Sequence, residues 1–179
     1  MTEQEMIQAA EALGFSAAAV ADTRDIVFDS TFRSYCEENL CGKYGANYAC
    51  PPDCGTPEEM KRRVLAHRKA LVLQTIWDIP DYTDNAAIKK AKGQHNKISL
   101  DLMKQLRAGG VPGFMAGSGG CSLCRECARV RNEPCVFPDL MYSCMSAYCI
   151  FVKKLADTCG MEYTPGDGLI AFFGMYVFD

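Results

Sequence analysis

Cysteine is the residue type most able to carry chemistry in this chain. Its 179 residues include eleven cysteines but only two histidines and one tryptophan. Eight cysteines form two groups of four, and the other three follow at wider spacing. The first cysteine group is Cys36, Cys41, Cys50 and Cys54, the second is Cys121, Cys124, Cys127 and Cys135, and the remaining ones are Cys144, Cys149 and Cys159. Thiolates gathered at short spacing are typical ligands of iron–sulfur clusters or zinc.

Two other interpretations of the cysteines compete with metal binding. Disulfides suit secreted chains, but the count here is odd, residues 1–6 show no export signal, and the chain is long enough to bury a core. Buried structural thiols pack as small hydrophobic side chains, which accounts for single cysteines but not for their clustering. We therefore expect metal ligation in the two groups.

The second cysteine group has the more specific spacing. Cys121, Cys124 and Cys127 form a C-x2-C-x2-C run, and Cys135 follows eight residues later. Such a run brings three thiolates around one 4Fe-4S cluster, and a more distant cysteine completes the site. Structural zinc more often uses two separated C-x2-C pairs. Bacterial ferredoxins place the next cysteine four residues after the run, so Cys135 is interpreted either as the fourth ligand or as a structural thiol.

The first cysteine group matches no familiar zinc spacing. Pro51-Pro52 follows Cys50 and stiffens the backbone into an extended path, and nearby tyrosines are suited to shielding a cluster from water. We expect Cys36, Cys41, Cys50 and Cys54 to hold a second 4Fe-4S cluster. If Cys54 points away, one iron is left open for a small molecule. A rigid loop with incidental thiols is the alternative.

The elements that must position these cysteines alternate between helix and strand. Apolar periodicity, caps and glycine stops predict helices over 3–13, 57–67, 84–107 and 146–158, and strands over 15–21, 26–28, 70–77, 114–116 and 169–177. The pattern predicts one α/β or α+β sandwich, a single domain over residues 1–179. Both cysteine groups lie in loops that leave this sandwich.

Charge is distributed unevenly along the chain. The net charge is −3, which argues against nucleic-acid binding, and no apolar stretch is long enough for a membrane helix. Residues 61–107 nevertheless contain 11 basic and 4 acidic side chains. This basic segment is interpreted either as a solvated helix surface or as a docking face for an acidic redox partner.

The cysteine motifs also resemble a known family. The matching residues are Cys36, Cys41, Tyr44-Gly45, Cys50-Pro51-Pro52, Cys121, Cys124, Cys127, Pro134-Cys135, Pro138 and the segment 145–152. In these residues the chain resembles an uncharacterised family of predicted metal-binding proteins from largely anaerobic bacteria and archaea. The resemblance implies a cytoplasmic iron–sulfur protein of anaerobic metabolism. Where that family has a serine, methionine, glutamate, alanine, tyrosine, glycine run, this chain lacks the glutamate and has cysteines at 144 and 149. These are alternative fourth ligands.

Three functions follow from these residues. The first is an electron-transfer or redox-accessory protein with two 4Fe-4S clusters. The second is an enzyme that uses a three-cysteine cluster with an open iron as a Lewis acid or sulfur carrier. The third is a structural module stapled by zinc, in which the metal holds the two cysteine loops.

Overall fold

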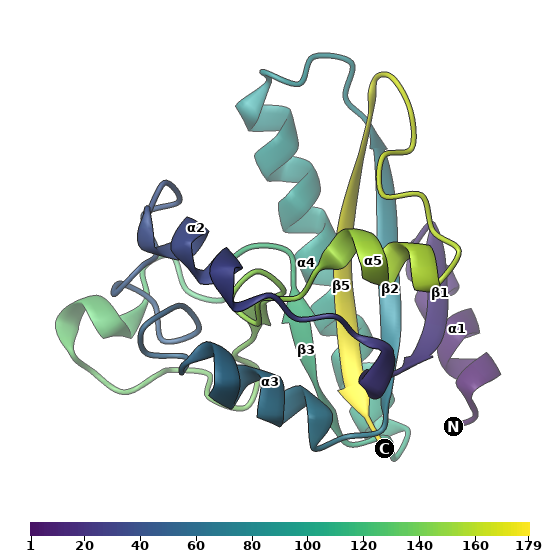
Figure 1. Cartoon of the computed structure of the whole chain (residues 1–179), viewed down its shortest axis with the longest axis horizontal. Coiled ribbons are helices and arrows are strands. Elements are labelled where there is room, and N and C mark those ends of the chain that lie inside the picture. Colours follow the sequence, from purple (N-terminus) through teal and green to yellow (C-terminus); the bar gives the residue numbers. More distant parts are fainter.

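The computed structural model describes residues 1–179 as a mixed α+β fold built on one five-stranded sheet (Figure 1). The strands are β1 Ala17–Asp22, β2 Lys69–Asp78, β3 Gly113–Gly117, β4 Ser143–Cys144 and β5 Leu169–Phe178. The helices are α1 Glu3–Ala12, α2 Arg33–Glu37, α3 Pro57–Leu65, α4 Asn85–Ala108 and α5 Val152–Thr158. The spatial strand order is β1-β2-β5-β3-β4, and only β3 and β4 run parallel.

The long antiparallel pair of β2 and β5 forms the middle of the sheet. All ten residues of β2 pair with β5, from Lys69 opposite Phe178 to Asp78 opposite Leu169. The side chains from Ala70 to Thr75 are buried on both faces of the sheet, which accounts for the continuous apolar run from Ala70 to Leu73. The predicted strands 70–77 and 169–177 are confirmed by these pairings.

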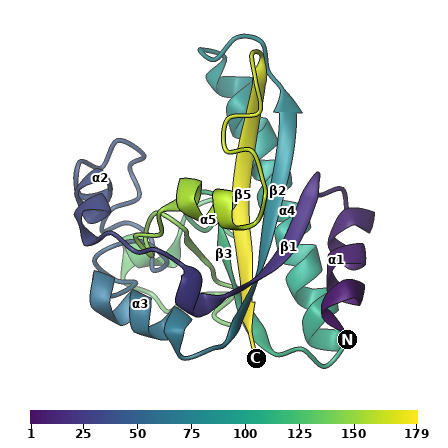
Figure 2. The same cartoon turned by 45° about the vertical axis from the view of Figure 1, so that its right-hand side comes forward.

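Helices cover both faces of the sheet (Figure 2). On one face, α1 and α4 pack their buried side chains against Leu71, Leu73 and Tyr176. On the other face, α3 and α5 pack against Val72, Met175 and other apolar side chains. The predicted sandwich is therefore a sheet between two helical layers, and its largely antiparallel pairing makes it α+β.

Two helices begin with the same local device. The hydroxyl groups of Thr2 at α1 and Thr56 at α3 accept hydrogen bonds from the backbone N–H groups of Glu5 and Glu59. In return, each glutamate carboxylate accepts a hydrogen bond from the backbone N–H of its threonine. These capping boxes satisfy backbone donors that the first turn of a helix leaves free. The predicted starts at residues 3 and 57 are confirmed.

The structure differs from the sequence-based prediction in two segments. Residues 26–28 form no strand, and only a single bridge joins Phe28 to Ile150. The predicted helix 146–158 is shorter, because α5 begins at Val152. Cys149 has a positive φ of 57°, so the backbone leaves the helical path there and turns toward the bridge. The residues just after Cys144 are consequently turns that pack into the core.

Both cysteine groups lie in loops beyond one edge of the sheet, on the side of β3 and β4 (Figure 1). The first loop contains α2, and the second contains a short 3-10 helix, Ala128–Arg131. No helix in the structure has the length and apolar character needed to span a membrane.

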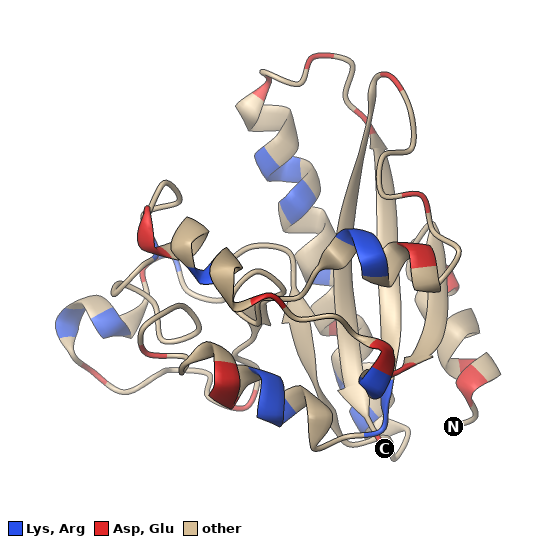
Figure 3. Ribbon diagram, in the orientation of Figure 1, with Lys and Arg blue, Asp and Glu red and all other residues tan.

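The basic segment 61–107 does not present a single surface. Its charges are divided between α3 and α4, which lie on opposite faces of the sheet (Figure 3). Several are also engaged: Arg68 and Lys69 pair with carboxylates, and Arg107 donates to the carbonyls of Gly113 and Asp139. Exposed basic side chains without a carboxylate partner lie on both α3 (Lys61, Arg62) and α4 (Lys90, Lys97, Lys104), so the segment does not form one docking face.

Candidate metal centre

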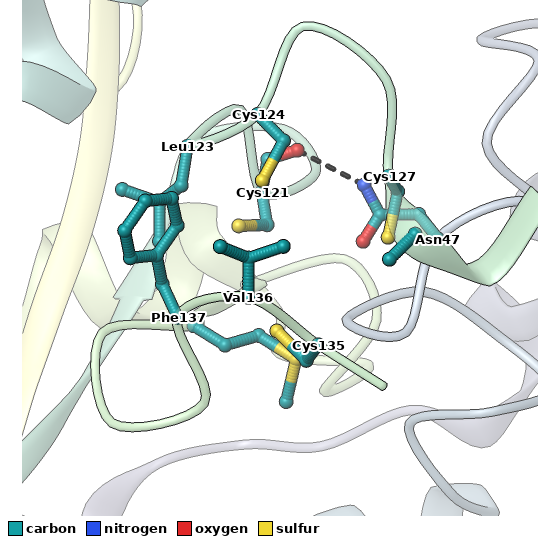
Figure 4. Close-up of a pocket in the computed structure, with 10 residues that line it drawn as sticks. Asn47, Cys121, Leu123, Cys124, Cys127, Cys135, Val136 and Phe137 are labelled. Atoms are coloured by element: carbon teal, nitrogen blue, oxygen red, sulfur yellow. Dashed lines mark hydrogen bonds between the residues drawn. The ribbon is translucent and has the colours of Figure 1, made fainter. Parts of the chain in front are cut away.

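The second cysteine group lines one pocket, which we call the second-group pocket (Figure 4). Its lining residues are Asn47, Cys121, Leu123, Cys124, Cys127, Ala128, Cys135, Val136, Phe137 and Met141. All four predicted cysteines of this group are present, including Cys135 despite its irregular spacing. Apart from Asn47 and the thiols, the lining side chains are apolar. The arrangement is a set of four soft sulfur donors enclosed by hydrophobic groups.

A polar clamp from α4 fixes the chain just before Cys121. The side chain of Asn96 donates to the carbonyl of Ser118 at 2.6 Å and accepts from the N–H of Ser118 at 2.9 Å. Asn47, from the first cysteine loop, donates to the carbonyl of Cys121 at 2.9 Å. The position of Cys121 is therefore set by contacts from two other parts of the chain, α4 and the first cysteine loop.

The far side of the second-group pocket is tied to the first cysteine loop. The hydroxyl of Tyr48 donates to the carbonyl of Glu133 at 2.7 Å. Arg129 forms a two-point contact with Asp53, with Nε 2.9 and 3.0 Å from the two carboxylate oxygens. The 3-10 helix between Cys127 and Cys135 ends at Asn132, which has a positive φ of 54°. These contacts turn the chain back so that Cys135 faces the other three cysteines.

The first-group pocket is lined by Cys36, Cys41 and Cys50 of the first cysteine group, together with Cys144. The other lining residues are Tyr35, Leu40, Lys43, Tyr44, Pro51, Gly119, Gly120 and Ser146. The hollow contains about 720 Å³ of space, counting the part open to solvent. Cys54, the predicted fourth member, does not line it. The sequence offered Cys144, like Cys149, as an alternative fourth ligand, and only Cys144 lines this pocket.

The three cysteines outside both pockets have structural surroundings. Cys54 is buried in the core with Met60 and Val64 of α3, and its sulfur lies 3.8 Å from the carbonyl of Gly55. Cys149 is buried, with its sulfur 4.0 Å from the carbonyl of Ala147. Cys159 ends α5 and packs at the margin of the same core.

The thiols of the first-group pocket interact electrostatically. The pKa of Cys36 is raised to about 11, mainly by burial and in part by the nearby thiol of Cys144. Burial likewise raises the pKa of Cys50 to about 12, with contributions from Cys144 and Cys41. The thiols are thus close enough together that negative charge on one disfavours negative charge on the next. A bound cation or cluster would reverse this, because it favours deprotonated ligands.

A buried cation lies next to these thiols. Arg33 is 91% buried and has no carboxylate partner. Its Nη1 donates to the carbonyl of Gly55 at 2.8 Å, and its Nη2 donates to the carbonyl of Ala147 at 2.9 Å. Its Nε is buried without a hydrogen-bond partner. The positive charge of Arg33 lowers the pKa of Cys36 and Cys54 against the larger effect of burial. Nothing in the local sequence marked Arg33 as part of a site.

Neither histidine belongs to the pockets. His95 is fully buried beneath the sheet, where its Nδ1 lies 2.9 Å from the hydroxyl of Thr75. The indole N–H of Trp77 donates to the same hydroxyl oxygen at 2.8 Å. Burial lowers the pKa of His95 to about 4. His67 pairs with Asp179 at 2.9 Å.

The donor set at both pockets suits a thiophilic metal group. No three His, Cys, Asp or Glu side chains lie close enough together to bind a single metal ion directly. Each pocket offers four cysteine sulfurs, the ligands that zinc and iron–sulfur clusters prefer. Backbone N–H groups also point at two of the sulfurs. The N–H of Ala147 donates to the sulfur of Cys144 at 3.3 Å. Burial raises the pKa of Cys121, and hydrogen bonds from the backbone of Leu123 and Tyr142 partly offset that rise.

The fold and the pockets define a class of α+β protein with two cysteine-lined hollows at one edge of its sheet. Sequence comparison then identifies the family: the chain belongs to DUF2284, described as a predicted metal-binding protein, which matches residues 19–178. The match covers both cysteine loops and all five strands except the first two residues of β1. No curated protein and no solved structure matches the chain.

Proposed function

We propose that the protein is an iron–sulfur protein that transfers electrons, with a 4Fe-4S cluster held by Cys121, Cys124, Cys127 and Cys135. One observation carries this proposal: these four cysteines, whose first three form a C-x2-C-x2-C run, line a single apolar pocket. That run is a ligand pattern of 4Fe-4S sites. When bound, such a cluster accepts and releases one electron at a time, exchanged with one-electron carrier proteins.

The residues around the pocket serve this role in two ways. Leu123 and Met141 place apolar groups beside the thiols, and backbone N–H groups directed at Cys121 stabilise negative charge on sulfur. The rim is open to the surface, with Val136 60% and Phe137 43% exposed. An electron carrier can therefore approach the site closely, while the thiols stay half-buried beneath the rim.

A redox partner belongs to the same proposal. Lys90, Lys97 and Lys104 are exposed on α4, at seven-residue steps, and none of them takes part in an ion pair. Lys92 on the same helix packs against Gly119, at the edge of the first-group pocket. An acidic carrier protein attracted to these lysines would lie beside the cysteine loops. Electron transfer to such a partner slows as salt screens the charges. The cytoplasm of an anaerobic cell suits this function, because a reducing compartment keeps thiols free.

The test is purification without air, followed by iron, zinc and acid-labile sulfide analysis and electron paramagnetic resonance of the reduced protein. Cys124→Ser should lose the iron, sulfide and spectroscopic signal of one cluster. Cys159→Ser is the matched control, because this thiol lies at the end of α5, away from both pockets. It should retain all three. Zinc without sulfide would overturn the proposal in favour of a zinc-stapled module.

A second candidate function draws on the first-group pocket. Only three members of the first cysteine group line that open hollow, since Cys54 is directed into the core. Three cysteines leave one iron of a 4Fe-4S cluster without a protein ligand, as required for an enzyme that uses the open iron as a Lewis acid. The role of Cys144 decides between this candidate and a fully ligated cluster.

A further inference from the structure

We infer that Cys36, Cys41, Cys50 and Cys144 form a second cluster-binding site, with Cys144 as the fourth ligand in place of Cys54. The inference rests on the proposed iron–sulfur function and specifies the second ligand set. It is carried by the first-group pocket, which these four thiols line together. Cys144 lies about 100 residues after the first cysteine group, in the edge strand β4. The proposed ligand set therefore combines three cysteines from one loop with one from the edge of the sheet.

The backbone fixes Cys144 in this position. It is the last residue of β4 and is paired with Gly117 of β3. The next residue, Met145, donates its N–H to the carbonyl of Gly117 at 3.0 Å. The N–H of Ala147 then points at the sulfur of Cys144 at 3.3 Å, in the manner of N–H groups that stabilise cluster thiolates. Cys144 is therefore both rigidly held and supplied with a donor.

The absence of a side chain at Gly120 also supports a binding site in the first-group pocket. A Cβ at Gly120 would lie 2.9 Å from the sulfur of Cys50, a distance that real Cβ atoms do not tolerate. The backbone of Gly120 thus lies so close to the sulfur that a side chain there would collide with it. Both Gly119 and Gly120 line the pocket.

Arg33 supplies the electrostatic reason for an anionic group here. A buried guanidinium without a carboxylate partner is costly unless some other negative charge lies nearby. The positive charge of Arg33 acts on the thiols of Cys36, Cys54 and Cys149. A cluster ligated by four thiolates carries net negative charge and would compensate this buried cation. Cys54 and Cys149 contact the carbonyls that flank Arg33 and lie outside the pocket.

The two sites are neighbours. Gly120 lines the first-group pocket, and the next residue, Cys121, lines the second-group pocket. Asn47 lies between Cys41 and Cys50 in the sequence, yet its side chain lines the second-group pocket and bonds to Cys121. Two clusters separated by so little chain should interact magnetically when both are reduced.

Cys144→Ser and Cys54→Ser form a matched pair of variants. Both cysteines are buried in the same core cluster, at 9% and 7% exposure, so the loss of packing is similar. In protein purified without air, Cys144→Ser should lose about half of the iron and sulfide, and the reduced protein should lose the magnetic interaction between clusters. Cys54→Ser should keep the wild-type iron, sulfide and spectrum. Circular dichroism checks that both variants retain the fold.

Several results would overturn the inference. Equal iron in Cys144→Ser and the wild type would exclude Cys144 as a ligand, as would a greater loss of iron from Cys54→Ser. The Gly120→Ala variant is a second test that changes no thiol. Because its Cβ would collide with the sulfur of Cys50, this variant should also lose about half of the iron. If Cys124→Ser removes all of the iron from the protein, the second site is absent while the proposed function stands. If the wild type contains no iron and sulfide, the proposed function fails first.

Discussion

Arg33 is the residue whose surroundings are least accounted for by packing alone. It joins the carbonyls of Gly55 and Ala147, so it links the end of the first cysteine loop to the turn after Cys144. Its charge is buried against thiols rather than carboxylates. A residue in this position holds two segments together and places a positive charge near the thiol of Cys36.

Replacing Arg33 with methionine should therefore have two effects. The free energy of unfolding should fall by about 2–4 kcal/mol, because two buried carbonyls lose charged donors. Iron retained at the first-group pocket should also fall, since the compensating positive charge is gone. Denaturant unfolding and iron analysis measure the two effects. Arg62→Met, an exposed arginine of α3, is the control and should change neither. Unchanged stability in Arg33→Met would contradict the assigned contacts.

His95 makes the stability of the protein depend on pH. Its pKa is about 4 in the folded chain, against an ordinary value of 6.5. Below pH 6.5 the unfolded chain takes up a proton that the folded chain excludes, so stability falls as the pH drops from 6.5 toward 4. The full loss is about 3 kcal/mol as an upper value. Denaturant unfolding between pH 4 and 7 should show this slope.

The His95→Asn variant should have a flatter pH profile over the same range, because asparagine offers a hydrogen bond to Thr75 but does not titrate. The control is His67→Asn, which removes the other histidine, half-buried and paired with Asp179, and should keep the slope due to His95. A wild-type profile without a decrease between pH 6.5 and 4 would show that His95 is not buried in its neutral form.

At the scale of elements, α4 acts as a support for the second cysteine loop. Its buried Asn96 makes two hydrogen bonds with the backbone of Ser118, three residues before Cys121. The same helix packs against the sheet through Leu102, Met103 and Leu106. The loop is consequently anchored to the rigid core at the point where it leaves β3, before the C-x2-C-x2-C run begins.

Asn96→Ala should lower the free energy of unfolding by about 2 kcal/mol, because it leaves the N–H and C=O of Ser118 without their partners. We also expect weaker metal retention at both pockets, measured as the rate of iron loss to a chelator, since Gly120 and Cys121 follow the clamp. Ser99→Ala on the same helix is the matched control. Its buried hydroxyl bonds only to the carbonyl of His95 within α4, so iron loss should keep the wild-type rate.

At the scale of the whole molecule, the sheet sandwich and the cysteine loops depend on different forces. The two core clusters join the sheet to α1, α4, α3 and α5, and the ten-residue pairing of β2 with β5 lies between them. The first cysteine loop buries few large side chains and exposes Tyr35 and Leu40. The sandwich can hold itself together by apolar burial, whereas we expect metal ligation to order the loops.

Removing the metal should therefore loosen the loops before it unfolds the sheet. In hydrogen-exchange mass spectrometry, metal-free protein should lose protection in residues 36–55 and 121–141, while β2 and β5 remain protected. The melting temperature should also fall, because ligand binding stabilises only the folded state. Equal exchange in these loops before and after metal removal would mean that protein contacts alone order them.

Much of the framework follows from local sequence. The capping boxes at Thr2 and Thr56, the apolar run after Lys69 and the glycines after α4 predicted the main helices and strands to within a few residues. The helix expected over 146–158 was wrong in its first half. There, Cys149 adopts a positive φ and Ile150 pairs with Phe28, an interaction that periodicity within the segment cannot reveal.

The sequence alone determined which residues are candidates to bind a metal group, because donor type and short spacing are local properties: Cys121, Cys124 and Cys127 were evident from their run. Only the tertiary structure decided how the thiols are grouped. Cys144 reaches the first-group pocket because β4 pairs with β3, while Cys54 turns into the core beside α3. The physical reason is that a site is defined by distances in space. For Cys144 those distances depend on strand pairing and core packing between segments about 100 residues apart along the sequence.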